Sequence, residues 1–326
     1  MLYDNILIDV FNLYYRVKSH TVVNDALGYA REVITRINTD IKSHLVENGN
    51  IYLLYDPIPK DDLGFDKSFK KMTARQNDLS VYKSNRVHDA KICKALFQVK
   101  KYFSHRGEHF INVISNGEFE ADDFVEPLLK DLTGDIALIT TDEDWARYLN
   151  DKVVMINDIW DKPFTVESFK EKYNFIPNIA SVSFYKACFG DGSDNIPGAL
   201  NVKIKSNDLK KKAFEVVQLF GMVNPDLEKV ISEFKTYSYK ALLDKTEKSI
   251  VEDLFLLIEA VDLKYSISTN LITNLNVIKC RCKSYKEYVH FKPVDEKYNK
   301  IIEKVLGFKT DVNFNKKPKF GMLRSK

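Results

Sequence analysis

The stretch that decides the fold is Asn5-Ile6-Leu7-Ile8-Asp9, an apolar run that ends in a carboxylate. Further short apolar runs follow, with helical periodicity between them, notably over Ala26–Val46 and Glu120–Leu132. The further apolar runs, each a predicted strand, are Ile51–Tyr55, Phe110–Ile114, Ile136–Ile139 and Val153–Ile156. Near-continuous apolar strands separated by helices are typical of a parallel sheet covered on both faces. The sequence predicts an α/β fold with a mostly parallel central sheet flanked by helices, and a mainly helical region from about Thr165 onward.

The bulk composition is that of an ordinary globular protein, with 326 residues, 44% hydrophobic residues and a net charge of +3. The chain opens directly into a strand without a signal-peptide layout, and no apolar run approaches the ~20 residues of a membrane span. The four cysteines, Cys93, Cys188, Cys280 and Cys282, lack a paired zinc spacing and are expected to be reduced. We therefore expect a reducing cytoplasm and no membrane partner. The chain is expected to be a monomer.

Carboxylates recur just past the carboxyl ends of the predicted strands. The first strand is followed by Asp9, the second by Asp56, the third by Glu120, Asp122 and Asp123, and the fourth by Asp142 and Asp144. Ligands of open α/β sheets bind at this edge. Each acid alone could cap a helix, but together they would repel one another at neutral pH. The pattern favours bound hard cations, Mg²⁺ or Mn²⁺, and two such ions ~4 Å apart can hydrolyse a phosphodiester.

A further acidic motif runs from Gly190 to Gly198 and holds Asp191 and Asp194 in a predicted tight turn between helices. The turn could serve only as a connection and a helix cap. Its two acids and the helix that follows also suit metal ligation and phosphate binding.

The region between Lys60 and Phe110 is basic, with twelve Lys or Arg against six Asp or Glu, and aromatic residues are interleaved. Basic side chains bind phosphates and aromatic rings stack on bases, so this composition suits a single-strand channel. An amphipathic helical pair with a solvated basic face would have the same composition.

Five short motifs occur in one order along the chain, and together they resemble the flap endonuclease and 5′→3′ exonuclease family, a branch with a PIN-like nuclease core. The resemblance is closest to the bacteriophage members, including the phage ribonuclease H type, and covers about residues 4–200. The motifs are Ile8-Asp9 with Asn12-Leu13 and Arg16, Tyr82-Lys83-Ser84-Asn85-Arg86, Glu120-Ala121-Asp122-Asp123, Thr141-Asp142-Glu143-Asp144, and Gly190–Gly198.

The resemblance implies a role for each matching residue. A first metal ion would lie among Asp9, Asp56, Glu120, Asp122 and Asp123, and a second would be completed by Asp142, Asp144, Asp191 and Asp194. The gateway (Tyr82, Lys83 and Arg86) would stand at the base of a helical arch over about residues 60–110, with Lys83 and Arg86 facing the scissile phosphate. Arg16 belongs to the same expected nucleic-acid surface. Glu143 departs from the family, which usually has a basic residue between the two aspartates.

The Gly190–Gly198 motif resembles the opening of the family's helix–three-turn–helix element, which grips duplex DNA and often holds a potassium ion. Gly198, Lys203 and Lys205 would contribute to this grip. Residues 1–178 would then form the nuclease core with its arch, and residues 179–326 the DNA-binding element and a C-terminal helical region. Residues 224–326 carry no sharp peptide motif, and a single-strand-binding protein or a sliding clamp are the protein partners considered for them.

The resulting hypothesis is a structure-specific 5′ nuclease with two metal ions that removes RNA primers or 5′ flaps in replication, acting on 5′-ended DNA or RNA–DNA hybrids. In this hypothesis Asp9 and Asp142 bind the metal ions, and Lys83 and Arg86 stabilise charge on the transferred phosphoryl group. Two alternatives stay open: a catalytically inactive nucleic-acid-binding protein of the same fold, and a single-strand ribonuclease of the compact PIN type. A haloacid-type phosphatase is disfavoured because Phe11 stands where its second aspartate is needed.

Overall fold

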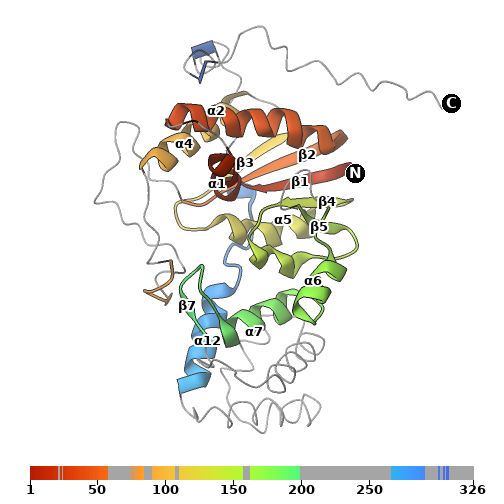
Figure 1. Ribbon diagram of the computed structural model, residues 1–326, viewed down its shortest axis with the longest axis vertical. Coiled ribbons are helices and arrows are strands. Elements are labelled where there is room, and N and C mark those ends of the chain that lie inside the picture. Colours follow the sequence, from red (N-terminus) through yellow and green to blue (C-terminus); the bar gives the residue numbers. More distant parts are fainter. Residues whose placement is uncertain are drawn as a thin grey trace, which may run out of the picture.

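The computed structural model describes the sheet, the helices around it and part of the C-terminal region (Figure 1). The described residues are 1–20, 23, 25–57, 75, 78–83, 90–106, 110–156, 162–198, 266–290, 300, 301, 304, 306 and 307. The predicted arch falls partly outside them. Its last segment forms helix α4 (Ala90–Arg106), which packs into the core through residues such as Leu96 and Val99.

The central sheet has the strand order β5-β4-β1-β2-β3-β8, and all its neighbours are parallel except β3 and β8. Its strands are β1 (Tyr3–Asp9), β2 (Leu45–Tyr55), β3 (Ile111–Ser115), β4 (Ile136–Ile139), β5 (Val153–Ile156) and β8 (Val289–His290). The predicted α/β class and the mostly parallel sheet are therefore confirmed. The antiparallel edge strand β8 returns from the C-terminal region to the sheet.

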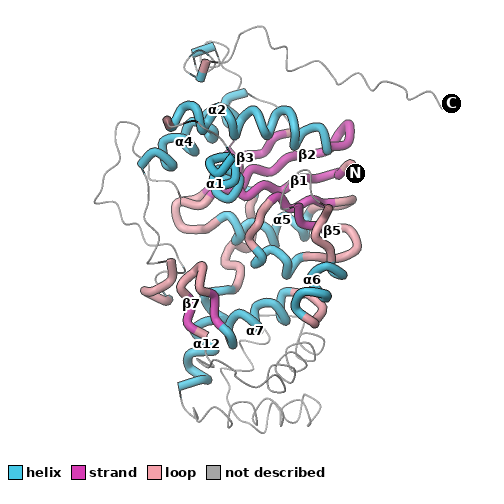
Figure 2. The backbone as a smooth tube through the Cα atoms, viewed as in Figure 1, coloured by secondary structure: helices cyan, strands magenta, loops and turns pink. Residues whose placement is uncertain are grey.

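Helices cover both faces of the sheet, and the tube view in Figure 2 shows these two layers with the strands between them. Alternate residues of β1 supply the two cores. Ile6 and Ile8 face α1 (Val10–His20), α2 (Ala26–Arg36) and α4, whereas Leu7 faces the other layer. That second layer contains α5 (Val125–Asp131), α6 (Val166–Tyr173), α7 (Ile179–Phe189) and α12 (Ser266–Ile278).

Short helical turns complete the layers. The predicted helix over residues 26–46 ends earlier, because α2 passes into a π-helical turn η1 (Ile37–Ile41) and a 3-10 turn η2 (Lys42–His44) before β2 begins. The 3-10 turns η3 (Ala121–Phe124), η4 (Glu143–Tyr148) and η5 (Lys286–Tyr288) follow later in the chain. Among the described helices, none has both the length and the apolar character to cross a membrane.

The motif from Gly190 to Gly198 forms a small antiparallel hairpin of β6 (Gly190–Asp191) and β7 (Ile196–Pro197). Gly190 ends α7 with φ +83°, and a Cβ on Gly198 would lie 2.6 Å from the carbonyl carbon of Phe189, so both positions require glycine. The buried Asn274 of α12 fixes the hairpin, since its Nδ2 donates to the carbonyls of Ala187 at 3.0 Å and Pro197 at 2.6 Å.

Substitution Asn274→Ala leaves these two carbonyls without their donor. Because an unpaired buried polar group costs about 1–3 kcal/mol, we expect a loss of about that size in the free energy of unfolding. Urea denaturation measures it. The matched control is Asn270→Ala, at an exposed position of the same helix, which should change stability by less than about 0.5 kcal/mol. Equal stability of the two variants would contradict the anchoring role of Asn274.

Candidate active site

Four carboxylates from separate segments meet at the carboxyl edge of the sheet. Asp9 ends β1, Asp56 follows β2, Glu120 follows β3, and Asp142 follows β4. Because these strands are parallel neighbours, their carboxyl ends share one edge. Burial raises the pKa of Asp9 to about 7, with help from the charges of Asp56 and Asp142, which places these three carboxylates together.

Backbone and side-chain hydrogen bonds hold the β1 and β4 ends against each other. Asp9 accepts from the amide of Asn12 at 3.0 Å and from Thr140 Oγ1 at 3.3 Å. Asn12 exchanges two bonds with Thr141, through its Nδ2 at 2.7 Å and its Oδ1 at 3.0 Å. Asp142 caps η4 by accepting from the amide of Asp144 at 3.0 Å. These bonds orient Asp9 and Asp142 before any ligand is bound.

Asp56 and Glu120 are oriented in the same way at the ends of β2 and β3. Asp56 Oδ1 accepts from the amide of Ala121 at 2.9 Å, at the start of η3. Glu120 is the N-cap of η3 and forms a capping box with Asp123. Burial raises the pKa of Asp56 to about 6, with Glu120 and Asp122 adding to the rise and Lys83 opposing it.

The gateway residues Tyr82 and Lys83 lie over Glu120. The Tyr82 hydroxyl donates to Glu120 Oε2 at 2.8 Å, and Lys83 Nζ lies 2.5 Å from the same oxygen. Lys83 has a positive φ of +49°, and its amide donates to the carbonyl of Asp194 at 2.8 Å. Asn195 Nδ2 also donates to the carbonyl of Val81 at 2.8 Å. The gateway is thus bonded both to the strand-end acids and to the hairpin.

A second group of acids comes from η4 and the hairpin. One carboxylate oxygen from each of Asp144, Asp191 and Asp194 lies within 4.8 Å of the others, which is a spacing that one metal ion can bridge. Lys186 of α7 forms ion pairs with Asp144 and, at 2.7 Å, with Asp191. Burial would raise the pKa of Asp191, but Lys186 and Ser193 outweigh it and lower that pKa to about 2.

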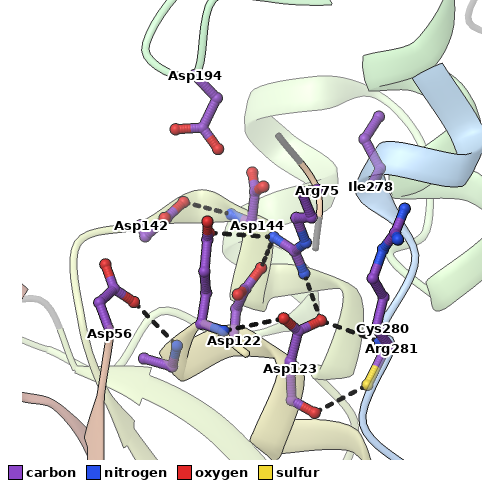
Figure 3. Close-up of polar contacts among 12 residues, drawn as sticks. Asp56, Arg75, Asp122, Asp123, Asp142, Asp144, Asp194, Ile278, Cys280 and Arg281 are labelled. Atoms are coloured by element: carbon purple, nitrogen blue, oxygen red, sulfur yellow. Dashed lines mark hydrogen bonds and ion pairs between the residues drawn. The ribbon is translucent and has the colours of Figure 1, made fainter. Parts of the chain in front are cut away.

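Arg75 is a buried cation in the acid cluster that the sequence did not single out. Its Nη1 lies 2.5 Å from Asp122 Oδ2 and 3.6 Å from Glu120, and its Nη2 donates to Asp123 at 2.9 Å (Figure 3). Burial would raise the pKa of Asp122, but Arg75, Lys83 and Arg147 outweigh it and lower that pKa to about 2. Lys186 and Arg147 were also missed, because both lie just outside the motifs that the sequence analysis recognised.

The chemistry of the donors fits hard divalent cations. Every carboxylate named supplies oxygen, and within the described residues no ion pair holds Asp9, Asp56 or Asp142. Burial raises the pKa of Asp9 to about 7 and that of Asp56 to about 6, and repulsion from neighbouring carboxylates adds to both shifts. A divalent ion bound among these oxygens would remove that repulsion.

The remaining residues that the sequence analysis singled out lie in different places. Asp123 lies beside the acids, but its carboxylate is bonded to Arg75 and to backbone amides. Glu143, expected to add charge near the metal ions, is held by Lys172 and Tyr173 of α6. Arg16 is half-buried on α1 and lines a shallow pocket with Leu13 and Ile139. Arg86, Lys203 and Lys205 lie outside the described residues, and the nucleic-acid-binding roles of Arg16 and Gly198 stay predictions.

Several curated proteins are similar in sequence to about two thirds of the chain. DNA polymerase I of Caldicellulosiruptor bescii is 32% identical over 233 residues, which are 66% of this chain and 26% of that protein. A 5′-3′ exonuclease of Buchnera aphidicola is 27% identical over 67% of this chain and 73% of its own length. The flap endonuclease of Escherichia phage T5 is 24% identical over 67% of this chain and 70% of its own length.

The chain is thus similar in sequence to a 5′-3′ exonuclease and to a flap endonuclease. The match spans about a quarter of the polymerase and most of the exonuclease and the flap endonuclease. No protein-family model matches the chain.

Solved structures show the same fold. The phage T5 5′-exonuclease with bound divalent zinc superposes with a TM-score of 0.52 and 20% identity, covering 93% of this chain and 99% of that one. The T5 D15 protein crystallised with metal ions gives a TM-score of 0.51 with 18% identity and the same coverage. The mostly parallel sheet with flanking helices that the sequence predicts is thus the fold of these structures.

The raised pKa values predict that metal binding depends on pH. Without metal, Asp9 and Asp56 bind protons more tightly in the folded than in the unfolded protein, and this stabilises the folded state. The stabilisation is fully present below the ordinary aspartate pKa near 4 and is lost as the pH rises through about 7. A divalent cation must displace these protons at pH 5.5 but not at pH 8. We therefore expect Mn²⁺ to raise the melting temperature of the nucleic-acid-free protein more at pH 8 than at pH 5.5.

Thermal unfolding with and without Mn²⁺ at both pH values measures this effect. The Asp9→Asn variant is the control, because it removes the group with the higher pKa and should reduce the difference between the two pH values. An equal Mn²⁺ stabilisation of the wild type at pH 5.5 and pH 8 would contradict the assignment.

Proposed function

We propose that this chain is a metal-dependent 5′ nuclease, a 5′→3′ exonuclease or flap endonuclease that removes RNA primers or 5′ flaps during DNA replication. The observation that carries the proposal is the convergence of carboxylates from β1, β2, β3, β4 and the hairpin beside the gateway residue Lys83. The similarity to exonucleases and flap endonucleases supports the same reaction class.

Phosphodiester hydrolysis needs an attacking water, an offset for charge on the phosphate, and a fixed geometry. Divalent cations, when bound, lower the pKa of a water and polarise the phosphodiester. Mg²⁺ or Mn²⁺ fit the all-oxygen donor set, with Asp9, Asp56, Glu120, Asp122 and Asp142 as ligands on the sheet side and Asp144, Asp191 and Asp194 on the hairpin side.

The chain's own residues supply positioning and charge. Hydrogen bonds from Asn12 and Thr140 fix the carboxylate of Asp9, and the hydroxyl of Tyr82 fixes that of Glu120. The ammonium of Lys83 is held between Glu120 and Asp194, at 2.5 Å and 3.9 Å. A phosphate bound at these acids would lie beside this ammonium, which offsets the charge that develops on its oxygens. We assign Arg86 the same role.

The nucleic-acid substrate would be a DNA with a 5′ flap or end, or an RNA–DNA hybrid. One solved structure of this fold is a pseudo-enzyme–product complex of the T5 flap endonuclease with DNA and metal ions. We further propose that Arg16, Gly198, Lys203 and Lys205 bind the duplex, that a potassium ion can assist near the hairpin, and that the enzyme acts in the cytoplasm. A single-strand-binding protein or sliding clamp is the partner to test for residues 224–326.

The Asp142→Asn variant tests the proposal on a labelled 5′-flap substrate with Mg²⁺. Loss of the carboxylate should reduce cleavage by at least about a hundredfold, because the residue would hold the catalytic cation. The matched control is Asp135→Asn, the same change at the amino end of β4, where the exposed side chain lies away from the site. Its cleavage rate should equal that of the wild type.

Two results would count against the nuclease. Equal cleavage by Asp142→Asn and Asp135→Asn would remove the acid cluster from the reaction. Tight flap binding by the wild type without any cleavage in Mg²⁺ or Mn²⁺ would favour a binding protein of the same fold.

A further inference from the structure

Asp123 is the meeting point of three segments that are far apart in the sequence. Its carboxylate is 1% exposed, and both oxygens accept hydrogen bonds from the protein. Oδ2 accepts from the amide of Glu120 at 3.0 Å, and Oδ1 accepts from Arg75 Nη2 and from the amide of Arg281, each at 2.9 Å. Figure 3 shows Arg75 between Asp122 and Asp123, with Arg281 and Cys280 approaching Asp123 from the other side.

The neighbouring Asp122 differs in a way that matters for metal binding. Its Oδ2 pairs with Arg75 at 2.5 Å and with Arg147 at 3.6 Å, whereas its Oδ1 has no hydrogen bond to any residue in the part of the chain that the structure describes. A carboxylate needs an available lone pair to coordinate a cation. One oxygen of Asp122 has no hydrogen bond, whereas both oxygens of Asp123 accept from arginine or backbone donors, which use three of its roughly four lone-pair sites.

Arg281 extends the contact from Asp123 to the segment before the gateway. Its guanidinium pairs with Asp78 and donates to the carbonyl of Asn276 at 2.8 Å. From Arg75 onward, backbone bonds continue the turn: Leu79 N–H to the Arg75 carbonyl at 3.1 Å, and Tyr82 N–H to the Leu79 carbonyl at 2.9 Å. Arg75 is 2% exposed and also donates to the Tyr82 hydroxyl at 3.2 Å. The two arginines therefore hold the turn that ends at Lys83.

The C-terminal segment approaches the acids at several points. Cys280 Sγ donates to the carbonyl of Asp123 at 2.9 Å, and Arg147 Nη1 donates to the carbonyl of Ile278 at 2.8 Å. The stretch Ile278–Arg281, which begins at the last residue of α12, thus lies against the acid cluster on the side where Asp123 and Arg147 are buried.

We propose that Asp123, Arg75 and Arg281 form a positioning unit that sets Lys83 and Tyr82 over the metal-binding acids, and that Asp123 binds the arginines instead of a metal ion. The unit makes the C-terminal segment a part of the active site. The proposal depends on the proposed nuclease function, because it concerns the geometry of that site. Asp123, Arg75 and Arg281 act through the gateway and are positioning residues.

The first experiment compares Asp123→Asn with Asp122→Asn by Mn²⁺ titration calorimetry on the full chain, without nucleic acid. If Asp123 is a positioning residue, its variant binds Mn²⁺ with the wild-type isotherm, whereas Asp122→Asn binds it at least about tenfold more weakly. In flap cleavage at saturating Mn²⁺, Asp123→Asn should lose about tenfold to a hundredfold in kcat with unchanged KM.

The outcomes separate this inference from the function itself. Equal weakening of Mn²⁺ binding in both variants would show that Asp123 is a ligand and would overturn the inference, while the nuclease proposal would stand. If neither substitution changed Mn²⁺ binding, the strand-end acids would not hold the metal, which overturns the proposed function and the positioning unit with it.

The second experiment uses the Asp78–Arg281 pair, whose side chains are 40% and 16% exposed. Such pairs contribute only about 0–1 kcal/mol to stability, so the variants should fold. We expect Arg281→Ala and Asp78→Ala each to lower kcat about threefold to tenfold, and the double variant to be no worse than either single one. Arg281→Lys should restore part of the loss.

The matched control is Lys286→Ala, which removes another exposed ion pair of the same C-terminal segment, with Asp131 at 2.9 Å. This variant should keep the wild-type kcat. If Arg281→Ala cleaved as fast as Lys286→Ala, or if the Asp78 and Arg281 effects simply added, the claim that this pair positions the gateway would be overturned.

Discussion

Repulsion between carboxylates at one edge of a parallel sheet is the constraint to which the rest of the site responds. Parallel strands bring Asp9, Asp56 and Glu120 to the same edge, and burial there strengthens their repulsion. The described structure offsets much of it with cations that each come from a different segment: Arg75, Lys83, Arg147 and Lys186. Elements as distant as α7 and α12 are thereby tied to the sheet edge.

These internal cations lie close to some of the acids and leave others without an ion pair. Asp122 and Asp191 pair with arginine or lysine, and their pKa values fall to about 2. Asp9 and Asp56 have no ion pair among the described residues, and their pKa values rise to about 7 and about 6. A divalent cation has most to gain where the charge is least offset. The electrostatics therefore favour the Asp9–Asp56–Asp142 side as the place where a cation binds with the largest release of repulsion.

The edge at which the acids lie could be predicted from the sequence because their placement depends on local rules. An apolar run fixes a strand, parallel pairing fixes the shared edge, and the residue after the run falls at that edge, as for Asp9 and Asp142. The partners were missed because pairing across long separations has no local signal. Arg75 meets Asp123 across 48 residues and Arg281 meets it across 158. Lys186 had a weak signal, since it lies five residues before Asp191. The helix predicted over residues 26–46 was too long, because α2 passes into a π-helical turn at Ile37 and β2 includes the last two residues of the expected range, Leu45 and Val46.

The buried ion pairs also determine how the site is assembled. A buried charge that loses its partner is strongly destabilising, so Arg75 and its acids must form together when the chain folds. The hydrogen bonds on Asp9, Asp56 and Glu120 likewise form without metal. The acids are therefore held in place by the protein itself, and a cation that enters finds oxygens already oriented. Because the site is preorganised, little of the binding energy of the cation is needed to order the acids. The segment Ile278–Arg281 contributes to this arrangement, because the carbonyl of Ile278 binds Arg147 and the amide of Arg281 binds Asp123.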